Sequence, residues 1–244
     1  MKKRIDLLLV DKKLASSRNK AQEMIRAGHV FIDNIKILKN GELFDDDISI
    51  FISKSYSDWV SRGALKLLHA LDSFNLDISN LTCLDIGAST GGFTEVLLSR
   101  NVKKIFAVDV GHNQLSRKLL NNDKVINLEK TNAKFLNREI IPDKIDIIVC
   151  DVSFISMKKV IKPALLLKLS EKLLIIALIK PQFESDRSEV GKGGIISDTS
   201  IHKRVCDDYK KWFTNNCKMR VINIISSPIK RDKGNIEFLI YVKK

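Results

Sequence analysis

A glycine-rich segment followed by an acidic residue is the first sign of chemistry in this sequence of 244 residues. Residues 84–93 read Leu-Asp-Ile-Gly-Ala-Ser-Thr-Gly-Gly-Phe, and Asp109 follows 18 residues after Gly91. Glycines let the backbone approach a ligand that side chains would block, and an acid at this distance can hydrogen-bond a ribose hydroxyl. The spacing predicts a nucleoside cofactor, and NAD and S-adenosylmethionine fit it equally well. The alternative is a structural turn in which Asp109 caps a helix that starts at His112.

Four further ionisable residues stand at the ends of expected elements. Asp151 and Lys180 each follow an apolar run directly, at the carboxyl end of a predicted strand, which is where open α/β sheets bind ligands. Lys66 lies at the start of the second half of the chain, and Glu237 lies in the last predicted strand. Each of them alone could be a surface charge or a helix cap, but we expect all four to converge on one rim.

The elements that would position these residues alternate strand and helix from residue 81 onward. Short apolar runs that read as strands, separated by helix-capable segments, lie at 82–86, 104–108, 144–150 and 173–179. This pattern predicts an α/β fold with a parallel sheet covered on both faces. Two last runs, 219–226 and 235–242, are joined without a helix and predict an antiparallel hairpin at the edge of the sheet. That hairpin favours S-adenosylmethionine over NAD, because an antiparallel terminal strand is typical of class I methyltransferases.

The first forty residues follow a different pattern. Ile5, Leu8 and Leu9 predict one helix, and Ser16 or Ser17 is placed to cap a second helix that ends at Gly28. Two short strands, 29–32 and 35–38, are expected on either side of Asp33-Asn34, whose residue types tolerate a tight hairpin. The acidic turn 45–47 and the polar run 53–58 mark a boundary. The predicted domains are therefore 1–58 and 59–244.

Charge indicates an anionic partner for the first of these domains. The chain holds 42 Lys+Arg against 29 Asp+Glu, a net charge of +13. Residues 1–30 hold eight of the basic residues against three acids, a density suited to phosphates. A solvated helix surface is the alternative interpretation of such a charged face.

Composition excludes several classes of protein. An apolar fraction of 44% with only 4 Pro and 11 Gly indicates a folded domain. The opening Met-Lys-Lys-Arg is not followed by an apolar segment, so we expect no secretory signal. The most apolar stretch, 160–179, is interrupted by charged residues and predicts no membrane span. No Cys/His cluster has metal-site spacing, so we predict no metal and reduced thiols in a cytoplasmic protein.

The N-terminal motifs resemble the S4 RNA-binding domain. The likeness rests on Arg4-Ile5-Asp6 opening the first helix, Ser17-Arg18 and Ala21 in the second, and Gly28-x-Val30 entering a strand. One departure is Asp33-Asn34-Ile35, where the family usually has an Asn-Gly turn. The resemblance implies that a set of basic residues faces structured RNA, where shape and phosphate contacts outweigh base reading. These residues are Arg4, Arg18, Lys20 and Arg26.

The larger part of the chain resembles the TlyA family. The matching motifs, in order, are WVSRGALKL from Trp59, GASTGGFT from Gly87, AVDVG from Ala107, DVSFIS from Asp151, KPQFE from Lys180 and GNIEF from Gly234. Members of this family are ribosomal RNA 2′-O-methyltransferases, often labelled haemolysins. In them a small α+β S4 domain precedes an FtsJ-like (RrmJ-like) class I methyltransferase domain with a Rossmann-like, mostly parallel, seven-stranded sheet and an antiparallel terminal hairpin.

The resemblance also implies roles for individual residues. Lys66, Asp151, Lys180 and Glu237 would form the catalytic tetrad, and Arg62 would join the surface that faces RNA. S-adenosylmethionine would be the cofactor, and the substrate would be ribosomal RNA or a ribosomal subunit, modified at a cytidine. The residues expected to bind the cofactor are Gly87, Ala88, Ser89, Gly91, Gly92, Phe93, Asp109, Val110, Asn132 and Asp151.

Methyl transfer to a ribose hydroxyl requires alignment of the acceptor and removal of its proton. We expect Lys180 to accept that proton, which requires a neutral amine. Burial and the cation of Lys66 favour the neutral form, whereas Asp151 favours the charged one. Asp151 would orient the lysine, and Glu237 would hold Lys66 or the acceptor ribose. The glycine-containing loop 184–196 could close over the site or be a passive surface loop.

Two other functions compete with this hypothesis. A cytolysin would need an export signal or a membrane-active segment, and the sequence displays neither. A non-catalytic RNA-binding assembly factor is disfavoured because all four tetrad positions carry the required side chains. Nothing in the sequence indicates an obligate protein partner.

Overall fold

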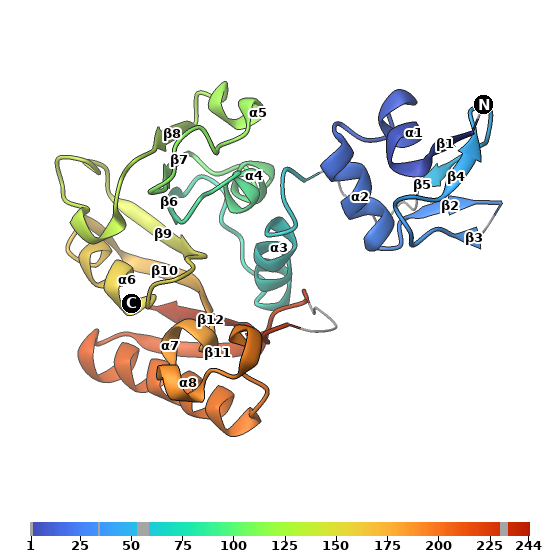
Figure 1. Cartoon of the computed structure of the whole chain (residues 1–244). Helices are drawn as coiled ribbons and strands as arrows, with labels where there is room; N and C mark the ends of the chain where they lie inside the picture. The colour runs from blue at the N-terminus through green and yellow to red at the C-terminus, as the bar shows by residue number, and fades with distance from the viewer. Residues whose placement is uncertain (1, 34, 53–58, 230–233) are drawn as a thin grey trace. The chain divides into compact units, whose positions relative to one another are not determined.

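The computed structural model describes residues 2–33, 35–52, 59–229 and 234–244. The chain divides into two compact units, Met1–Asp58 and Trp59–Lys244, drawn in Figure 1. Asn34 of the predicted hairpin turn and the polar run 53–58 lie outside the described residues.

The first unit packs two helices against short strands. Helix α1 (Ile5–Asp11) starts directly after β1 (Lys2–Arg4), and α2 (Arg18–Arg26) is capped by the Ser17 hydroxyl, which accepts from the Lys20 N–H at 3.2 Å. Ser17, one of the two predicted caps, is therefore the cap. The apolar stripes predicted from the sequence form the core. Its buried members include Ile5, Leu9, Ala21, Met24, Ile25, Val30 and Ile32.

The strands of this unit form two antiparallel sheets. Strand β1 pairs with β4 (Leu43–Asp45), and β2 (Val30–Ile32) lies between β3 (Ile35–Lys36) and β5 (Phe51–Ile52). The predicted hairpin is therefore present, with strands shorter than expected. Asp33 has φ +48, as a tight turn requires.

The second unit is built on a seven-stranded sheet in the order β11-β12-β10-β9-β6-β7-β8. Strands β6 to β10 are parallel, and β12 is antiparallel to both of its neighbours. The strands are β6 (Thr82–Ile86), β7 (Lys104–Val108), β8 (Val125–Leu128), β9 (Ile145–Cys150), β10 (Leu169–Ile179), β11 (Arg220–Ser226) and β12 (Phe238–Lys243). The α/β prediction with an antiparallel terminal hairpin is confirmed.

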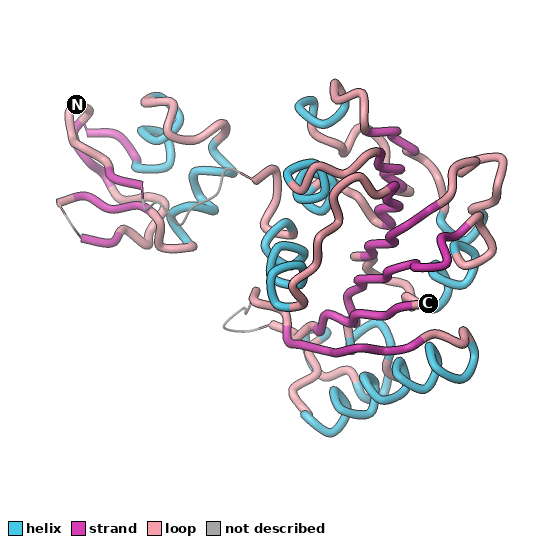
Figure 2. Tube along the Cα trace, turned by 180° about the vertical axis from the view of Figure 1, so that it is seen from behind, coloured by secondary structure: helices cyan, strands magenta, loops and turns pink. Residues whose placement is uncertain are grey.

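Helices cover both faces of this sheet, as Figure 2 shows. One face packs against α3 (Ala64–Ser73) and α4 (Gly92–Ser99), and the other against α6 (Lys158–Ala164) and α8 (Thr199–Lys211). Neighbouring strand residues alternate between the two cores: Ile147 and Val149 pack on one side and Ile148 on the other. The shorter elements are α5 (Arg117–Leu120), α7 (Pro181–Glu184), the 3-10 helices η1 (Ala133–Phe135), η2 (Arg187–Glu189) and η3 (Lys192–Gly194), and the π-helix η4 (Trp212–Asn216).

Three details differ from the sequence prediction. Strand β8 is not among the predicted runs, and β10 starts at Leu169 rather than at residue 173. Glu237 lies just before β12 and not inside it, because Phe238 is the first residue paired with β10. The Glu237 carbonyl oxygen still accepts the Ser227 N–H at 2.8 Å, so its backbone is held beside the end of β11.

Among the described residues, the longest apolar helices fall short of the length and hydropathy that crossing a bilayer requires.

Candidate active site

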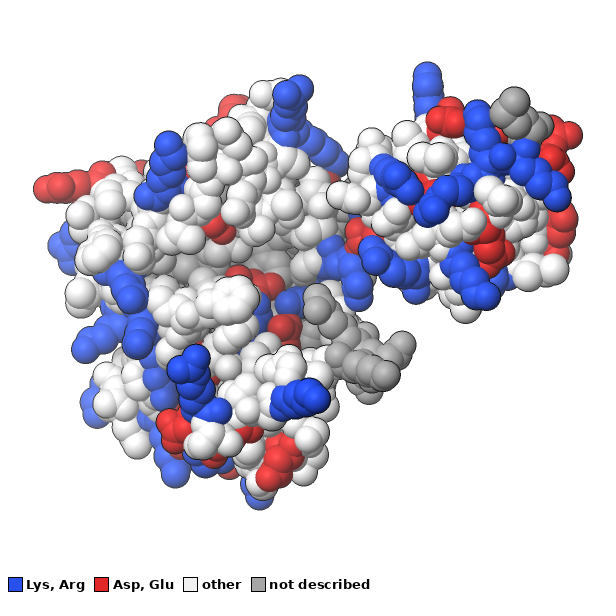
Figure 3. Space-filling model, viewed as in Figure 1, with Lys and Arg blue, Asp and Glu red and all other residues white. Residues whose placement is uncertain are grey.

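A cavity of about 630 Å³ opens at the carboxyl ends of β6, β9 and β10. This is where open α/β sheets bind ligands. Figure 3 shows a hollow in the viewed face of the larger unit where acidic and basic side chains meet. The side chains that line the cavity include Arg62, Lys66, Phe93, Asp151, Ser153, Phe154, Lys180, Gln182, Phe183, Asn235 and Glu237.

The four predicted tetrad residues meet in this cavity as one ion-paired group. Lys66 Nζ lies 3.2 Å from Asp151 Oδ2 and 2.6 Å from Glu237 Oε2. Lys180 Nζ lies 2.5 Å from Asp151 Oδ1. Asp151 therefore bridges both lysines, and the two carboxylates balance the two ammonium groups.

Each member of the tetrad comes from a different element. Lys66 is on the first turn of α3, Asp151 directly follows β9, Lys180 directly follows β10, and Glu237 precedes β12. The strand order β12-β10-β9 makes the last three elements neighbours in the sheet. Helix α3 brings Lys66 to them because its buried face packs on this sheet.

Lys180 is the most buried of the four and has a second polar neighbour. The residue is 7% exposed. Its Nζ donates to Ser153 Oγ at 2.8 Å, in addition to its contact with Asp151. Sequence reasoning did not select Ser153, which lies two residues after Asp151 in the same turn.

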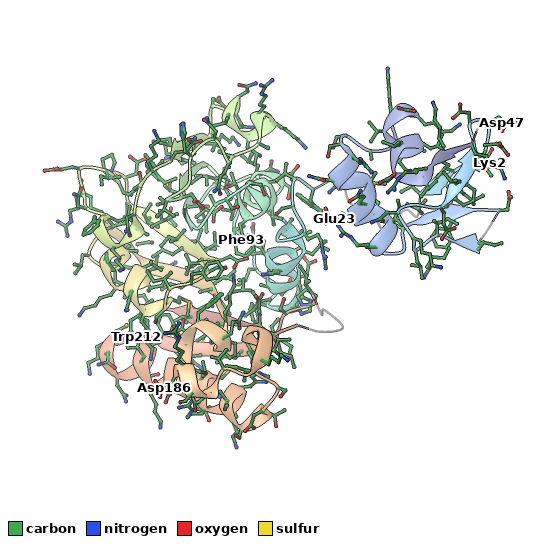
Figure 4. All side chains as sticks on the ribbon, in the orientation of Figure 1. Lys2, Glu23, Asp47, Phe93, Asp186 and Trp212 are labelled. Carbon is green, nitrogen blue, oxygen red and sulfur yellow. The ribbon has the colours of Figure 1, made fainter. Side chains whose placement is uncertain are left out.

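The glycine-rich segment forms the adjacent wall. Gly87 has φ +84, and a Cβ there would stand 2.6 Å from the Asp151 carbonyl oxygen, so only glycine lets the turns after β6 and β9 approach this closely. The predicted cofactor residues Gly87, Ala88, Ser89, Gly92 and Phe93 line the cavity. Figure 4 labels Phe93 at the start of α4.

Gly91 does not line the cavity but supports its wall. It has φ +98 as the N-cap of α4, and an added Cβ would lie 2.1 Å from a methyl carbon of Leu119. Gly91 therefore allows the segment around α5 to pack closely on the glycine-rich turn.

Asp109 connects the loops that follow β6 and β7. Its carboxylate accepts the Ser89 N–H at 2.8 Å and the Gly111 N–H at 2.7 Å. Residues 112–116 are not helical, so Asp109 does not cap a helix that starts at His112.

Val110 and Asn132 lie on the loops next to Asp109 and outside the cavity lining. Val110 is exposed, and the Asn132 side chain accepts the Lys134 N–H at 3.0 Å, capping η1. The Thr131 N–H donates to the Asp109 carbonyl oxygen at 2.9 Å, which brings the loop that carries Asn132 beside Asp109.

Asp85 is a buried carboxyl beneath the glycine-rich turn that sequence reasoning did not select. It accepts the Thr94 hydroxyl at 2.7 Å, and its other oxygen has no hydrogen-bond partner among the described residues. Burial raises the pKa of Asp85 to about 7, against the lowering effect of the Thr94 hydrogen bond. Asp85 faces α4, whose first turn carries Thr94.

An aromatic pair, of which one ring is exposed, stands at the cavity. Phe154 is 91% exposed, has φ +63, and its ring centroid lies 5.0 Å from that of Phe183. A bulky residue with positive φ is an outlier that surrounding structure must impose. Neither ring was predicted as a site residue, because exposure of an apolar side chain cannot be read from sequence.

Buried Glu95 joins the segment that carries Arg62 to α4. Its carboxylate accepts the Val60 N–H at 2.7 Å and Lys118 Nζ at 2.7 Å. Ser61 Oγ would lie 2.2 Å from a Cβ at Gly92, so this segment packs directly on the glycine-rich turn. Arg62 is exposed and lines the cavity.

Loop 184–196 reaches the cavity through Gly193 and Ile195. Asn235 holds the loop through two hydrogen bonds of 2.8 Å. The side-chain oxygen of Asn235 accepts the Ile196 N–H, and the side-chain NH2 group donates to the Gly194 carbonyl oxygen. The loop is thus tied to the segment that carries Glu237.

In the first unit, buried Asp6 organises two of the predicted RNA-facing arginines. It accepts Arg4 through Nε and Nη2, both at 3.0 Å, and Arg18 Nε at 3.1 Å. Gln22 donates to the same carboxylate at 2.8 Å. The pKa of Asp6 lies well below its usual range, mainly because of the hydrogen bonds from Arg4. The Arg4 and Arg18 side chains remain 42% and 52% exposed.

The other two predicted RNA-facing residues differ from each other. Arg26 is exposed in the last turn of α2. The Lys20 side chain is only 13% exposed and its Nζ lies 3.9 Å from Glu23. Lys20 is therefore less accessible to a partner than the three arginines.

Groups of three or more His, Cys, Asp or Glu with the geometry of a metal site are absent from the described ranges.

Comparisons with known proteins agree with this architecture. The model of the FtsJ-like methyltransferase family matches residues 59–244, and that of the S4 domain matches residues 3–45. Hemolysin A of Brachyspira hyodysenteriae is 41% identical over 98% of this chain and 98% of its own length. The 16S/23S rRNA (cytidine-2′-O)-methyltransferase TlyA of Mycobacterium tuberculosis is 39% identical over 98% of this chain and 89% of its own length.

A solved structure extends the agreement to three dimensions. A Streptococcus thermophilus protein, provisionally named a hemolysin, superposes with a TM-score of 0.76 at 36% identity, covering 100% of this chain and 88% of the other. These matches extend over both units. The chain belongs to the TlyA family, in which an S4 domain precedes an FtsJ-like methyltransferase domain.

Proposed function

We propose that the protein transfers a methyl group from S-adenosylmethionine to a ribose 2′-hydroxyl of ribosomal RNA, at a cytidine. The observation that carries this proposal is the ion-paired group of Lys66, Asp151, Lys180 and Glu237 beside a glycine-rich wall. Two relatives named as rRNA (cytidine-2′-O)-methyltransferases, from Mycobacterium tuberculosis and Campylobacter jejuni, support the substrate. Since ribosomal RNA is its substrate, we assign the protein to the cytoplasm.

The residues present fit this cofactor. Gly87, Ala88 and Ser89 expose backbone to the cavity, and Asp109 at the end of β7 can accept from a ribose. Val110 and Asn132 flank Asp109 and would extend the cofactor site beyond the cavity. The cofactor supplies a methyl group bonded to a sulfonium sulfur, and this sulfur becomes a neutral thioether when the methyl group is transferred. Carboxylates at the cavity suit a ligand that carries positive charge.

The four tetrad residues have different roles in proton removal and positioning. Lys180 takes the 2′-hydroxyl proton onto Nζ as the oxygen forms its bond to the methyl carbon. Asp151 holds Lys180 in place and Glu237 holds Lys66. With Lys180 neutral, the tetrad carries one net negative charge, which offsets the charge of a sulfonium.

The aromatic pair supports an unstacked nucleotide as the substrate. A 2′-hydroxyl reaches a cavity more easily when its base leaves the helical stack. Phe154 presents its ring to solvent beside the tetrad, and RNA bases stack on such rings in many complexes. Arg4, Arg18 and Arg62 are the cations that we assign to RNA phosphates.

The decisive experiment is incubation with labelled S-adenosylmethionine and ribosomal subunits, followed by mapping of alkali-resistant ribose positions. We expect label on a cytidine ribose and its loss with Asp151→Ala. Lys180→Arg tests the proton acceptor, because arginine stays charged at all accessible pH values. Absence of ribose label, or label on a base, would refute the proposal, and full activity of Lys180→Arg would remove Lys180 from the base role.

The hemolysin name of the Brachyspira relative favours one further candidate, lysis of red cells. An erythrocyte assay with wild type and Asp151→Ala compares the two functions. Lysis that persists in the variant would make it an activity separate from the tetrad.

A further inference from the structure

The amine of Lys180 is held from two sides by one turn. Asp151 Oδ1 lies 2.5 Å and Ser153 Oγ 2.8 Å from Nζ, and both residues follow β9, whereas Lys180 follows β10. Lys180 is buried, but Ser153 is exposed and lines the cavity. Both residues line the cavity, so the amine and the hydroxyl that contacts it face the same space.

The N–H groups and the lone pair of the Lys180 amine explain why this arrangement matters for catalysis. A neutral lysine amine has two N–H donors and one lone pair. The hydrogen bond that Nζ donates to Ser153 Oγ, together with the ion-pair contact to Asp151 Oδ1, restricts rotation of the amine and so the direction of its lone pair. Without the Ser153 hydroxyl, rotation about the Cε–Nζ bond could turn the lone pair away from the acceptor. A base contributes to the rate only when it points at the proton it removes.

The backbone holds the Ser153 hydroxyl in place. The next residue, Phe154, has φ +63, and its ring packs 5.0 Å from that of Phe183. On the other side, the Asp151 carbonyl oxygen lies so near Gly87 that a Cβ there would be at 2.6 Å. These contacts restrain the backbone of the turn on both sides of Ser153.

We propose that Ser153 is a positioning residue, whose hydroxyl fixes the Lys180 amine with its lone pair directed at the acceptor hydroxyl. The inference rests on the proposed function, in which Lys180 accepts the 2′-hydroxyl proton. It adds a neutral fifth member to the four charged residues.

The pH profile of the reaction should carry the signature of this contact. An acceptor on the ammonium form stabilises that form, so removing the hydroxyl favours the neutral amine. The acid limb of the rate profile then moves to lower pH while the plateau rate falls. The substitution leaves the surrounding titratable groups in place: Asp151 and Cys150 interact with Lys180 directly, Lys66 and Asp85 interact with Asp151, and Glu237 pairs with Lys66.

The test compares Ser153→Ala, Ser153→Thr and Ser197→Ala, an exposed serine outside the cavity lining. Methyl transfer to ribosomal subunits is measured across the pH range, with kcat and KM for RNA and cofactor. For Ser153→Ala we expect kcat to fall about tenfold, KM to stay unchanged, and the acid limb to move to lower pH. Ser153→Thr, which keeps the hydroxyl, should restore most of the rate, and Ser197→Ala should match wild type.

The outcomes separate the two proposals. If the wild type is active but Ser153→Ala has an unchanged kcat or an unmoved acid limb, the positioning role is overturned. The proposed function then stays intact. An inactive wild type would overturn the proposed function, and this inference with it. Urea unfolding of each variant checks that rate differences do not come from loss of the fold.

Discussion

At the scale of single residues, the site depends on side chains whose surroundings change their chemistry. Lys66, Asp151, Lys180 and Glu237 could be selected from sequence because each belongs to a recognisable motif. Ser153, Phe154 and Asp85 could not. A serine two residues after an acid is common in sequences and does not indicate a site. The positive φ of Phe154 and the complete burial of Asp85 cannot be inferred from residue type.

Asp85 makes the stability of the fold depend on pH. Its pKa of about 7 in the folded protein exceeds the unfolded value of 3.8, so the folded state holds the extra proton between these values. This contribution to stability is therefore present at low pH and is lost as pH rises from about 4 toward 7. Relative to Asp85→Asn, which does not titrate, the wild type should lose about 2–3 kcal/mol between pH 5 and pH 7. Urea unfolding at several pH values measures the difference; parallel curves for the two proteins would contradict it.

Phe154 allows a test of base stacking with little change to the backbone. Asparagine tolerates positive φ, so Phe154→Asn should keep the turn and remove the ring. We expect kcat/KM for RNA to fall about 5- to 150-fold, because stacking of a base on an aromatic ring contributes about 1–3 kcal/mol. Phe154→Tyr, which keeps a ring, is the control. Equal kcat/KM for wild type and Phe154→Asn would exclude the stacking role.

At the scale of elements, hydrophobic patterning predicted most of the architecture. The runs that became β6 and β7 match their predicted bounds, because each is a short, mostly apolar run. Strand β8 was not predicted, because Val125–Leu128 includes an asparagine and is only partly buried at the sheet edge. Three polar residues, 170–172, interrupt the start of β10, so the sequence pattern does not extend the strand back to Leu169, which pairs with Ile145 of β9. Glu237 was placed inside a strand because period-2 patterning does not locate a strand end.

The glycine-rich turn provides a prediction about packing between elements. Gly91→Ala combines φ +98 with a Cβ 2.1 Å from Leu119, so it should destabilise the fold by about 2–4 kcal/mol. Gly193→Ala has a similar φ, +76, but meets nothing within 4 Å and should cost only about 1 kcal/mol. Chemical unfolding gives the free energy of unfolding of each variant, and the difference between the two variants measures the contribution of packing against Leu119. Equal losses would show that Leu119 adapts freely.

At the scale of the whole molecule, binding and chemistry are assigned to different units. The first unit carries an arginine pair ordered by Asp6, and the second carries the cavity. Sequence reasoning selected the arginines from their charge and their motif. It did not anticipate Asp6 as their common partner, because an acid in the first turn of a helix usually interacts with the helix itself.

The arginine pair leads to a prediction about salt. If Arg18 contacts a phosphate, Arg18→Ala should weaken RNA binding and lower the slope of log affinity against log salt by about one. Lys12→Ala, an exposed basic residue after α1, is the matched loss of charge. Binding to ribosomal RNA is measured between about 50 and 200 mM salt. A slope that changes equally in both variants would mean that Arg18 contributes only net charge.

The position of β12 has a consequence for biosynthesis. Of the seven strands of this sheet, β12 is synthesised last, yet it lies between β10 and β11. Until residues 238–243 leave the ribosome, β10 keeps an unpaired edge that can recruit other chains, a hazard for a nascent polypeptide. Glu237 directly precedes β12, so a chain translated only to this point has three of the four members of the tetrad. The last strand of the sheet and the last member of the ion-paired group are therefore completed together.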